Sequence, residues 1–318
     1  MMTKQPTVLA MPAGRRAIRS LMLSVVDDKL NPTIEILYIT WNRLAYTKLT
    51  LPTVLERGGD VDYEVCITDN GSTDGTVEYL ESLDHPRIKR ITFKEKNAGI
   101  SPVTNEFWEK AELDYVGKVD NDILLPDRWL EPIMRVHAAG DPDVGIVGLT
   151  HFHRDEIDSL DEHSYSHNIK SLKDGVKVFV QLHLGGACYV FPRKLFQKLG
   201  NADLHPEALT HGWSDKQQEY FRAGYFPCYV YPWITCKHLG DGRYQETDFD
   251  IDPPETEEAC AERTRRHQAM LTDRMPGKEW DSRKREATNV CLALCADLTR
   301  LRRRLWEIRH RRRIERGS

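Results

Sequence analysis

The stretch KVDNDILLP, residues 118–126, places two carboxylates, Asp120 and Asp122, one residue apart where an apolar run ends. Residues 115–119 predict a short buried strand, and Pro126 closes the segment. The acidic pair is therefore expected on the loop that leaves the carboxyl end of this strand, which is where open α/β sheets bind their ligands. Taken alone, an Asp-x-Asp pattern favours a solvated turn, since Asp and Asn are common turn residues.

The residues upstream of this stretch alternate between strand and helix patterns. Apolar runs predict strands, and runs bounded by glycines or turn residues predict helices. The expected strands are 34–40, 63–69, 88–93 and 115–119, and the expected helices lie within 44–58, 76–83 and 94–111. A β-α-β-α-β-α-β order predicts a parallel sheet with right-handed crossovers.

Composition indicates a folded protein without a marked preference for nucleic acid. The chain has 318 residues, 40% of them hydrophobic, a formal net charge of -4 and a pI near 6.3. Its apolar runs are shorter than the roughly 20 residues of a membrane span. The seven cysteines include no CxxC pair, which favours reduced, packed thiols over a disulfide framework or a zinc site. We expect a soluble, cytoplasmic protein.

Four segments in register resemble one known family. The segments ILYITWNR, CITDNGSTDGT, NAGISPVTN and VDNDILLP are similar to the amino-terminal half of family 2 glycosyltransferases of the GT-A fold. The resemblance covers residues 33–150 closely and extends more loosely to about 240. It implies an α/β fold with a mostly parallel central sheet flanked by helices. The glycine fingerprint G-x-G-x-x-G is absent, which argues against a dehydrogenase.

The resemblance implies a nucleotide-sugar site at the strand ends. Asp69 would accept a hydrogen bond from the ring N–H of a pyrimidine such as uracil, and capping of the next helix is assigned to Asp74 or Ser72 instead. The other residues implied for the donor site are Thr40, Asn42, Arg43, Asn97, Gly99, Asp120, Asn121, Gly185 and Gly186. Arg43 is equally well explained as a surface charge, and Asn105 is expected to be structural.

A divalent metal, Mn²⁺ or Mg²⁺, is the expected cofactor. Asp120 would contact the ribose or the metal, and Asp122 would bind the metal directly. The resemblance to metal-dependent relatives favours His238 as a further ligand, although a lone histidine near a strand end is ordinarily structural. The metal would neutralise the charge that develops on the departing diphosphate.

The second half is expected to supply the acceptor side. Residues 144–149 predict a strand, and the polar stretch 151–175, with four histidines, predicts a surface loop that could serve as a lid. The segment HGWSDKQQEYFRAGY, 211–225, resembles the family's base-bearing region, with Asp215 as the base and Glu219 in reserve. The usual Glu-Asp pair is Ser214-Asp215 here, which puts the base in doubt. Trp213, beside it, is expected to contact the acceptor.

The carboxyl-terminal part has a different composition. An apolar seam with alternating steps of three and four residues predicts a helix, formed by Cys291, Leu294, Leu298, Leu301, Leu305 and Ile308. Arginines crowd its other surfaces, which indicates a dimer, packing on the catalytic domain, or an anionic partner such as a membrane surface or nucleic acid. The expected organisation is an arm (1–30), a GT-A domain (31–250, divided at 150) and a basic helical extension (251–318).

The sequence thus predicts transfer of a sugar from a nucleotide diphosphate, with uridine diphosphate first, to a hydroxyl acceptor with inversion. The acceptor stays open between a glycan, a lipid-linked glycan, a small molecule and a hydroxylated base in DNA. The second hypothesis is a nucleotidyltransferase, which also uses paired carboxylates and a metal on an α/β sheet. The third hypothesis is a non-catalytic protein that binds nucleotide sugars or nucleic acid.

Overall fold

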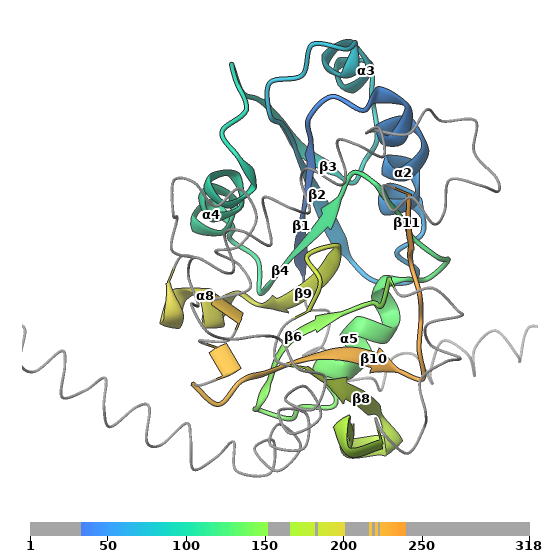
Figure 1. Ribbon diagram of the computed structural model, residues 1–318, viewed down its shortest axis with the longest axis vertical. Helices are drawn as coiled ribbons and strands as arrows, with labels where there is room; N and C mark the ends of the chain where they lie inside the picture. The colour runs from blue at the N-terminus through green and yellow to red at the C-terminus, as the bar shows by residue number, and fades with distance from the viewer. Residues whose placement is uncertain are drawn as a thin grey trace, which may run out of the picture. The chain divides into compact units, whose positions relative to one another are not determined.

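A nine-stranded sheet organises the computed structural model, which describes residues 33–151, 166–181, 184–200, 216–217, 220–221 and 223–239 (Figure 1). The strand order is β3-β2-β1-β4-β9-β6-β10-β8-β7. The strands are β1 (Ile34–Thr40), β2 (Tyr63–Asp69), β3 (Ile88–Phe93), β4 (Tyr115–Asp120), β6 (Val144–Gly148), β7 (Ile169–Ser171), β8 (Lys177–Val180), β9 (Cys188–Pro192) and β10 (Phe226–Tyr231). The helices are α2 (Leu44–Glu56), α3 (Thr76–Glu81), α4 (Ile100–Lys110), α5 (Leu130–Ala138) and α8 (Arg193–Leu199).

The first half of the sheet is parallel. All seven residues of β1 are buried, as expected for a central strand of an α/β sheet covered on both faces. The register pairs Thr40 of β1 with Asp69 of β2, and Ile39 with Asp120 of β4. Because these strands run in one direction, their carboxyl ends lie at one edge of the sheet. The predicted strand and helix alternation is confirmed.

The second half adds antiparallel strands. β9 runs antiparallel to both β4 and β6, whereas β10 is parallel to β6 and antiparallel to β8. The predicted strand at 144–149 is confirmed as β6. The stretch 151–175, expected to be a loop throughout, contains β7, because Ile169–Ser171 pairs with β8 at the sheet edge.

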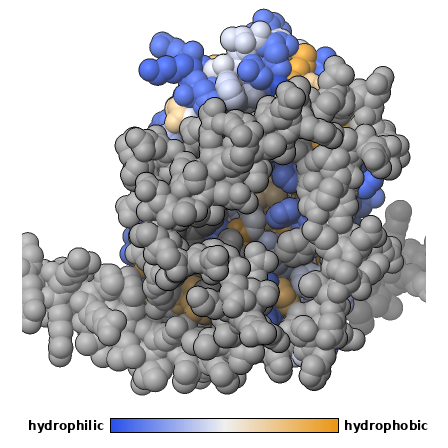
Figure 2. Space-filling model, viewed as in Figure 1, coloured by the Kyte–Doolittle hydropathy of each residue, from blue (hydrophilic) through white to orange (hydrophobic). Residues whose placement is uncertain are grey.

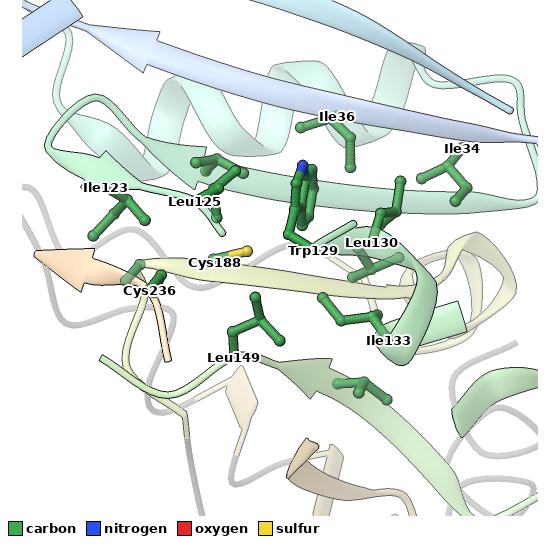
Figure 3. Packing of buried hydrophobic residues seen from close by; sticks show 14 of the residues in the cluster. Ile34, Ile36, Ile123, Leu125, Trp129, Leu130, Ile133, Leu149, Cys188 and Cys236 are labelled. Carbon is green, nitrogen blue, oxygen red and sulfur yellow. The ribbon is translucent and has the colours of Figure 1, made fainter. Parts of the chain in front are cut away.

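Helices cover both faces of this sheet. Side chains of α2, α3 and α5 join one hydrophobic cluster and those of α4 and α8 the other. In the first cluster Trp129 is fully buried, and Figure 3 shows its indole projecting toward Ile36 of β1. Ile123 and Leu125, which follow the acidic pair, belong to the same cluster, so the acidic turn is anchored to the core.

Few large apolar side chains are exposed on the described part of the chain. The exposed ones are Trp41, which follows β1, Phe93, which ends β3, and Ile100, which begins α4. The described surface around α3 is mainly hydrophilic (Figure 2). The four described cysteines, Cys66, Cys188, Cys228 and Cys236, are buried free thiols. Among the described helices, none has the length and apolar character needed to cross a bilayer.

Candidate active site at the carboxyl edge of the sheet

A small second sheet brings His238 to the acidic turn. β5 (Ile123–Leu124) pairs antiparallel with β11 (Lys237–His238), with His238 opposite Ile123. The N–H of Leu239 also donates to the carbonyl of Asp122 at 2.8 Å. The Nε2 atom of His238 consequently lies 3.3 Å from Oδ2 of Asp122. Two residues expected to share a metal are therefore neighbours.

Each acidic residue is also paired with a cationic side chain. The Lys118 ammonium donates to Oδ1 of Asp120, and Arg43 Nη1 donates to Oδ2 of Asp122 at 2.8 Å. Burial raises the pKa of Asp120, and the charge of Asp122 adds to that increase, while Lys118 opposes it. Burial would also raise the pKa of Asp122, but the hydrogen bond and charge of His238, together with Arg43, outweigh it and hold this pKa below its ordinary value. Asp122 is thus kept ionised.

The donor atoms around Asp122 fit a divalent cation. Its Oδ1 atom is buried and has no hydrogen-bond partner within the described part of the chain. Carboxylate oxygens and an imidazole nitrogen suit manganese, and a buried unpaired carboxylate oxygen calls for a cation or a proton donor. No cluster of three His, Cys, Asp or Glu side chains is assembled as a metal site in the described ranges. A metal would therefore rely on Asp122 and His238, with Asp120 or the donor phosphates completing its shell.

Asp69 presents one free carboxylate oxygen. Its Oδ2 atom accepts the backbone N–H groups of Gly71 at 3.1 Å and Ser72 at 2.9 Å. Its Oδ1 atom is buried and unpaired among the described residues. The carboxylate is therefore fixed by its own turn with a single acceptor left over.

The turn after β2 is fastened to the turn after β1. Asn42 donates its backbone N–H to Ser72 Oγ at 2.7 Å, and its side-chain oxygen accepts from the N–H of Thr73 at 2.9 Å. Asp74 accepts from the N–H of Leu44, the first residue of α2, and from that of Thr76, the first residue of α3. The N-cap of α3 is Gly75, which has no side-chain cap, so the predicted capping by Asp74 or Ser72 is wrong, and Asp74 instead binds the first helical N–H from the position before the cap. Asn42 therefore fixes the backbone of the turn at Ser72 and Thr73.

The side chains of Asn70 and Asn97 join the loop after β3 to the end of β2. Asn70 Nδ2 donates to Oδ1 of Asn97 at 2.9 Å, and Asn70 Oδ1 accepts from the N–H of Ala98 at 3.0 Å. The same Asn97 oxygen accepts from Gly99 at 2.8 Å. Asn97 and Gly99 thus lie beside the end of β2, as the sequence predicts for the donor site, and Asn97 organises the loop backbone there.

Thr40 and Asn121 direct their polar groups inward. Thr40 Oγ1 lies 2.8 Å from Thr47 Oγ1 and accepts from Asn121 Nδ2 at 3.1 Å. The carbonyl of Asn121 accepts from Thr50 Oγ1 at 2.8 Å. This buried network joins β1, α2 and the acidic turn. It fixes the backbone between the two carboxylates.

The two glycines before β9 have different surroundings. A Cβ on Gly185 would lie 2.2 Å from Cε1 of His151, whereas one on Gly186 would meet only Lys118 Nζ, at 3.9 Å. Gly185 therefore makes room for an imidazole of the protein, and His151 in turn packs edge-on against His238, with ring centroids 5.7 Å apart. Gly186 is exposed, and among the described residues only the Lys118 terminus lies within 4 Å of a Cβ built there.

Several predicted positions lie outside the described residues. These are the base Asp215, its reserve Glu219, the acceptor contact Trp213, the histidines His153 and His163, the amino-terminal arm and the basic extension. They stay predictions.

The structure adds Lys118 and Gln217 to the residues around the site. Lys118 is 3% exposed, and Gln217 is fully buried. The sequence could have indicated Lys118, because side chains alternate along a strand and a lysine two residues before Asp120 lies on the same face of YVGKVD. Gln217 had no comparable signal, since its contacts are made with a distant segment.

Three comparisons place this chain among known proteins. The family model described as glycosyl transferase family 2 matches residues 35–200, a little over half of the chain. The hyaluronan synthase of Pasteurella multocida is 32% identical over 111 residues, 33% of this chain and 11% of that protein. The chondroitin synthase of Escherichia coli is 41% identical over 69 residues, 21% of this chain and 10% of that protein. This chain thus spans about a tenth of the length of these relatives.

A solved structure shares the fold. The mannosyltransferase PcManGT from Pyrobaculum calidifontis, in complex with GDP-Man and Mn²⁺, aligns with a TM-score of 0.51. The alignment covers 88% of this chain and 89% of that one, at 17% identity. The predicted GT-A fold is confirmed.

Proposed function

The chain belongs to glycosyl transferase family 2, and we propose that it transfers a sugar from a uridine diphosphate donor to a hydroxyl acceptor. The observation that carries this proposal is the pair of buried carboxylate oxygens, Asp69 Oδ1 and Asp122 Oδ1, that lack partners among the described residues. Asp69 ends β2, and Asp122 follows the end of β4. One oxygen calls for a hydrogen-bond donor and the other for a cation, as a nucleotide diphosphate with its metal would supply.

The free oxygen of Asp69 favours a pyrimidine base. Uracil offers one ring N–H between two carbonyls, which matches one acceptor atom. Guanine presents two adjacent donors and would need both carboxylate oxygens, but Oδ2 is already occupied by Gly71 and Ser72. The solved neighbour carries GDP-Man, and the likeness to it is one of fold alone. We therefore assign uridine to this chain.

Asp122 and His238 would hold the divalent metal, with Asp120 beside them. When bound, the metal supplies positive charge that stabilises the departing diphosphate. Arg43 supplies a further cation. Its guanidinium already contacts Asp122, and its side chain is 38% exposed. We propose that Arg43 turns from Asp122 to a donor phosphate when the nucleotide sugar binds.

The acceptor hydroxyl would be deprotonated by Asp215, as proposed from the sequence. Attack on the anomeric carbon opposite the leaving diphosphate inverts its configuration. The chemical identity of the acceptor stays open between a glycan, a lipid-linked glycan, a small molecule and modified DNA.

A thermal-shift and calorimetry screen tests the proposal. A ligand that binds only the folded state raises its melting temperature. We expect a shift with UDP-sugars in the presence of MnCl₂ that is lost in Asp122→Ala, and no comparable shift with GDP-mannose. Asp69→Asn is expected to weaken UDP binding by about tenfold, because a hydrogen bond to a charged acceptor is lost. Equal binding of UDP and GDP by the wild type would contradict the uridine assignment.

A further inference from the structure

Three consecutive backbone units next to the acidic pair are each held by a different buried side chain. Gln217 pairs with Leu184 in both directions: its Oε1 accepts the N–H at 2.8 Å, and its Nε2 donates to the carbonyl at 3.1 Å. The hydroxyl of Tyr229 on β10 accepts the N–H of Gly185 at 2.9 Å. Lys118 on β4 donates to the carbonyl of Gly186 at 3.0 Å. We call residues 184–186 the glycine segment.

The three side chains hold this segment in a way that ordinary sheet pairing does not. The glycine segment precedes β9, so its polar groups are not satisfied by the strand ladder. Backbone polar groups need partners, and the four groups named above are each held by a side chain from a separate part of the described chain. Such bonds fix the position of the segment relative to the core. They also make that position sensitive to single substitutions.

Lys118 links the glycine segment to the acidic pair. The same ammonium donates to Gly186 and to Oδ1 of Asp120, and it lies 6.0 Å from the ring centre of Tyr189. The N–H of Asp120 also donates to the carbonyl of Ala187 at 3.0 Å. The side chain of Lys118 is only 4% exposed, so its charge is shared between these partners and not with solvent. Asp120 and Gly186 therefore hold fixed positions relative to each other.

The open face of Gly186 is the nearest place for a sugar. Gly186 is exposed, and of the residues that the structure describes, a Cβ there would meet only the Lys118 ammonium within 4 Å. Because Lys118 contacts both Asp120 and Gly186, a diphosphate held at the acidic pair would place its sugar close to this surface. A glycine backbone lets a ligand approach closely, which a side chain would prevent.

We propose that Lys118, Gln217 and Tyr229 are positioning residues that hold the glycine segment as a platform for the sugar moiety of the donor. This inference rests on the proposed function, because it takes the ligand to be a nucleotide sugar. The three residues act through the backbone of the segment and do not themselves react. Loss of any one of them should disturb sugar binding more than nucleotide binding.

Calorimetry with UDP, UDP-glucose and UDP-N-acetylglucosamine in MnCl₂ tests the proposal. The readout is the ratio of the dissociation constants for UDP and for the UDP-sugar that the wild type binds. A residue needed only for stability changes the melting temperature and leaves this ratio alone. We expect Gln217→Met and Lys118→Met to shift the ratio against the sugar by about tenfold, as expected when buried hydrogen bonds are lost.

The Gln217→Met/Lys118→Met double variant distinguishes one platform from two independent contacts. If the segment acts as a unit, the double variant loses about as much as either single variant, since residues in one network are not additive. If the affinity losses of the two single variants multiply in the double variant, the proposal is overturned. Tyr229→Phe removes only a hydroxyl, so it decides the question if the other variants do not fold, with an expected shift of about threefold.

Lys89→Met is the matched control. Lys89 is an exposed lysine of β3 and pairs with Glu64 of β2 at 2.9 Å, away from β9. The ratio of the dissociation constants for UDP and the UDP-sugar should be the same in Lys89→Met as in the wild type. Unchanged ratios in the three positioning variants would overturn the platform alone. A wild type that binds neither UDP nor either UDP-sugar would instead overturn the proposed function and the platform with it.

Discussion

The imidazole of His238 lies 3.3 Å from the carboxylate of Asp122, although the two residues lie far apart in the sequence. The contact depends on the pairing of β5 with β11, two strands of two residues each. It places an imidazole nitrogen beside the carboxylate that is kept ionised.

Removing the imidazole should weaken metal binding. His238→Ala is expected to raise the dissociation constant for Mn²⁺ by about 10- to 100-fold, the usual cost of losing a group that supports a metal site. Manganese titration by calorimetry or electron paramagnetic resonance measures this without the need for an acceptor. His85→Ala, at a half-buried histidine in the loop between α3 and β3, is the control. Unchanged Mn²⁺ affinity in His238→Ala would remove His238 from the metal shell.

Removing Arg43 should have opposite effects on metal and donor. The guanidinium competes with a cation for Oδ2 of Asp122, so Arg43→Met should bind Mn²⁺ tighter by a few fold, since a partly exposed ion pair contributes up to about 1 kcal/mol. The same variant should bind UDP more weakly, because a cation for the diphosphate is lost. Titrations of Mn²⁺ and of UDP check the two signs separately. Weaker binding of both would show that Arg43 supports the acidic turn and does not compete with the metal.

Alanine at the two adjacent glycines should give different results. Gly185→Ala places a methyl group 2.2 Å from His151, so the imidazole must move, at a cost of about 1–3 kcal/mol in unfolding free energy. Gly186→Ala meets only a lysine terminus at 3.9 Å and should change stability by less than about 0.5 kcal/mol. Urea unfolding of both variants measures the difference. Equal stabilities would contradict the close packing of His151 on Gly185.

Acid should destabilise the fold through His137. Burial lowers its pKa from 6.5 to about 4, while its hydrogen bond to the carbonyl of Val190 opposes the shift. The pKa is depressed in the folded state, so the neutral form contributes full stability above about pH 6.5 and this contribution is lost as pH falls toward 4. The shift corresponds to about 3 kcal/mol in total.

Unfolding in urea between pH 7 and pH 4.5 checks this prediction. His137→Phe keeps a ring against Tyr115, whose centroid lies 4.9 Å away, but cannot titrate. Its stability should depend less on pH across this window than that of the wild type. Parallel pH profiles for the two proteins would contradict the assignment.

Local sequence patterns predicted the first half of the fold because its elements are long and strongly patterned. The apolar run of β1 and the turn residues after Asp69 determine strands and turns by themselves. β5 and β11 are too short to have a pattern, and pairing direction, as in antiparallel β9, depends on contacts distant in sequence. These elements emerged only from the folded structure.

The candidate site divides in the same way. Asp69, Asp120 and Asp122 could be proposed from strand ends together with the family resemblance, and the structure brings Asp122 and His238 together. The ion pair of Arg43 with Asp122 could not be foreseen, since it depends on the left-handed backbone of Asn42 and Arg43 at the end of β1. The hold of Gln217 on Leu184 likewise joins segments that no local pattern connects.

Because β9 runs antiparallel to β4, this strand pair has two distinct ends, and we expect them to tolerate substitutions differently. Asp120 leaves β4 at the edge where Ala187 enters β9, whereas Tyr115 meets Pro192 at the opposite edge. Library mutagenesis aimed at a new donor sugar therefore belongs between residues 184 and 187. Labels, surface tethers and fusion partners belong at the opposite edge, near residue 114, where they leave donor binding undisturbed.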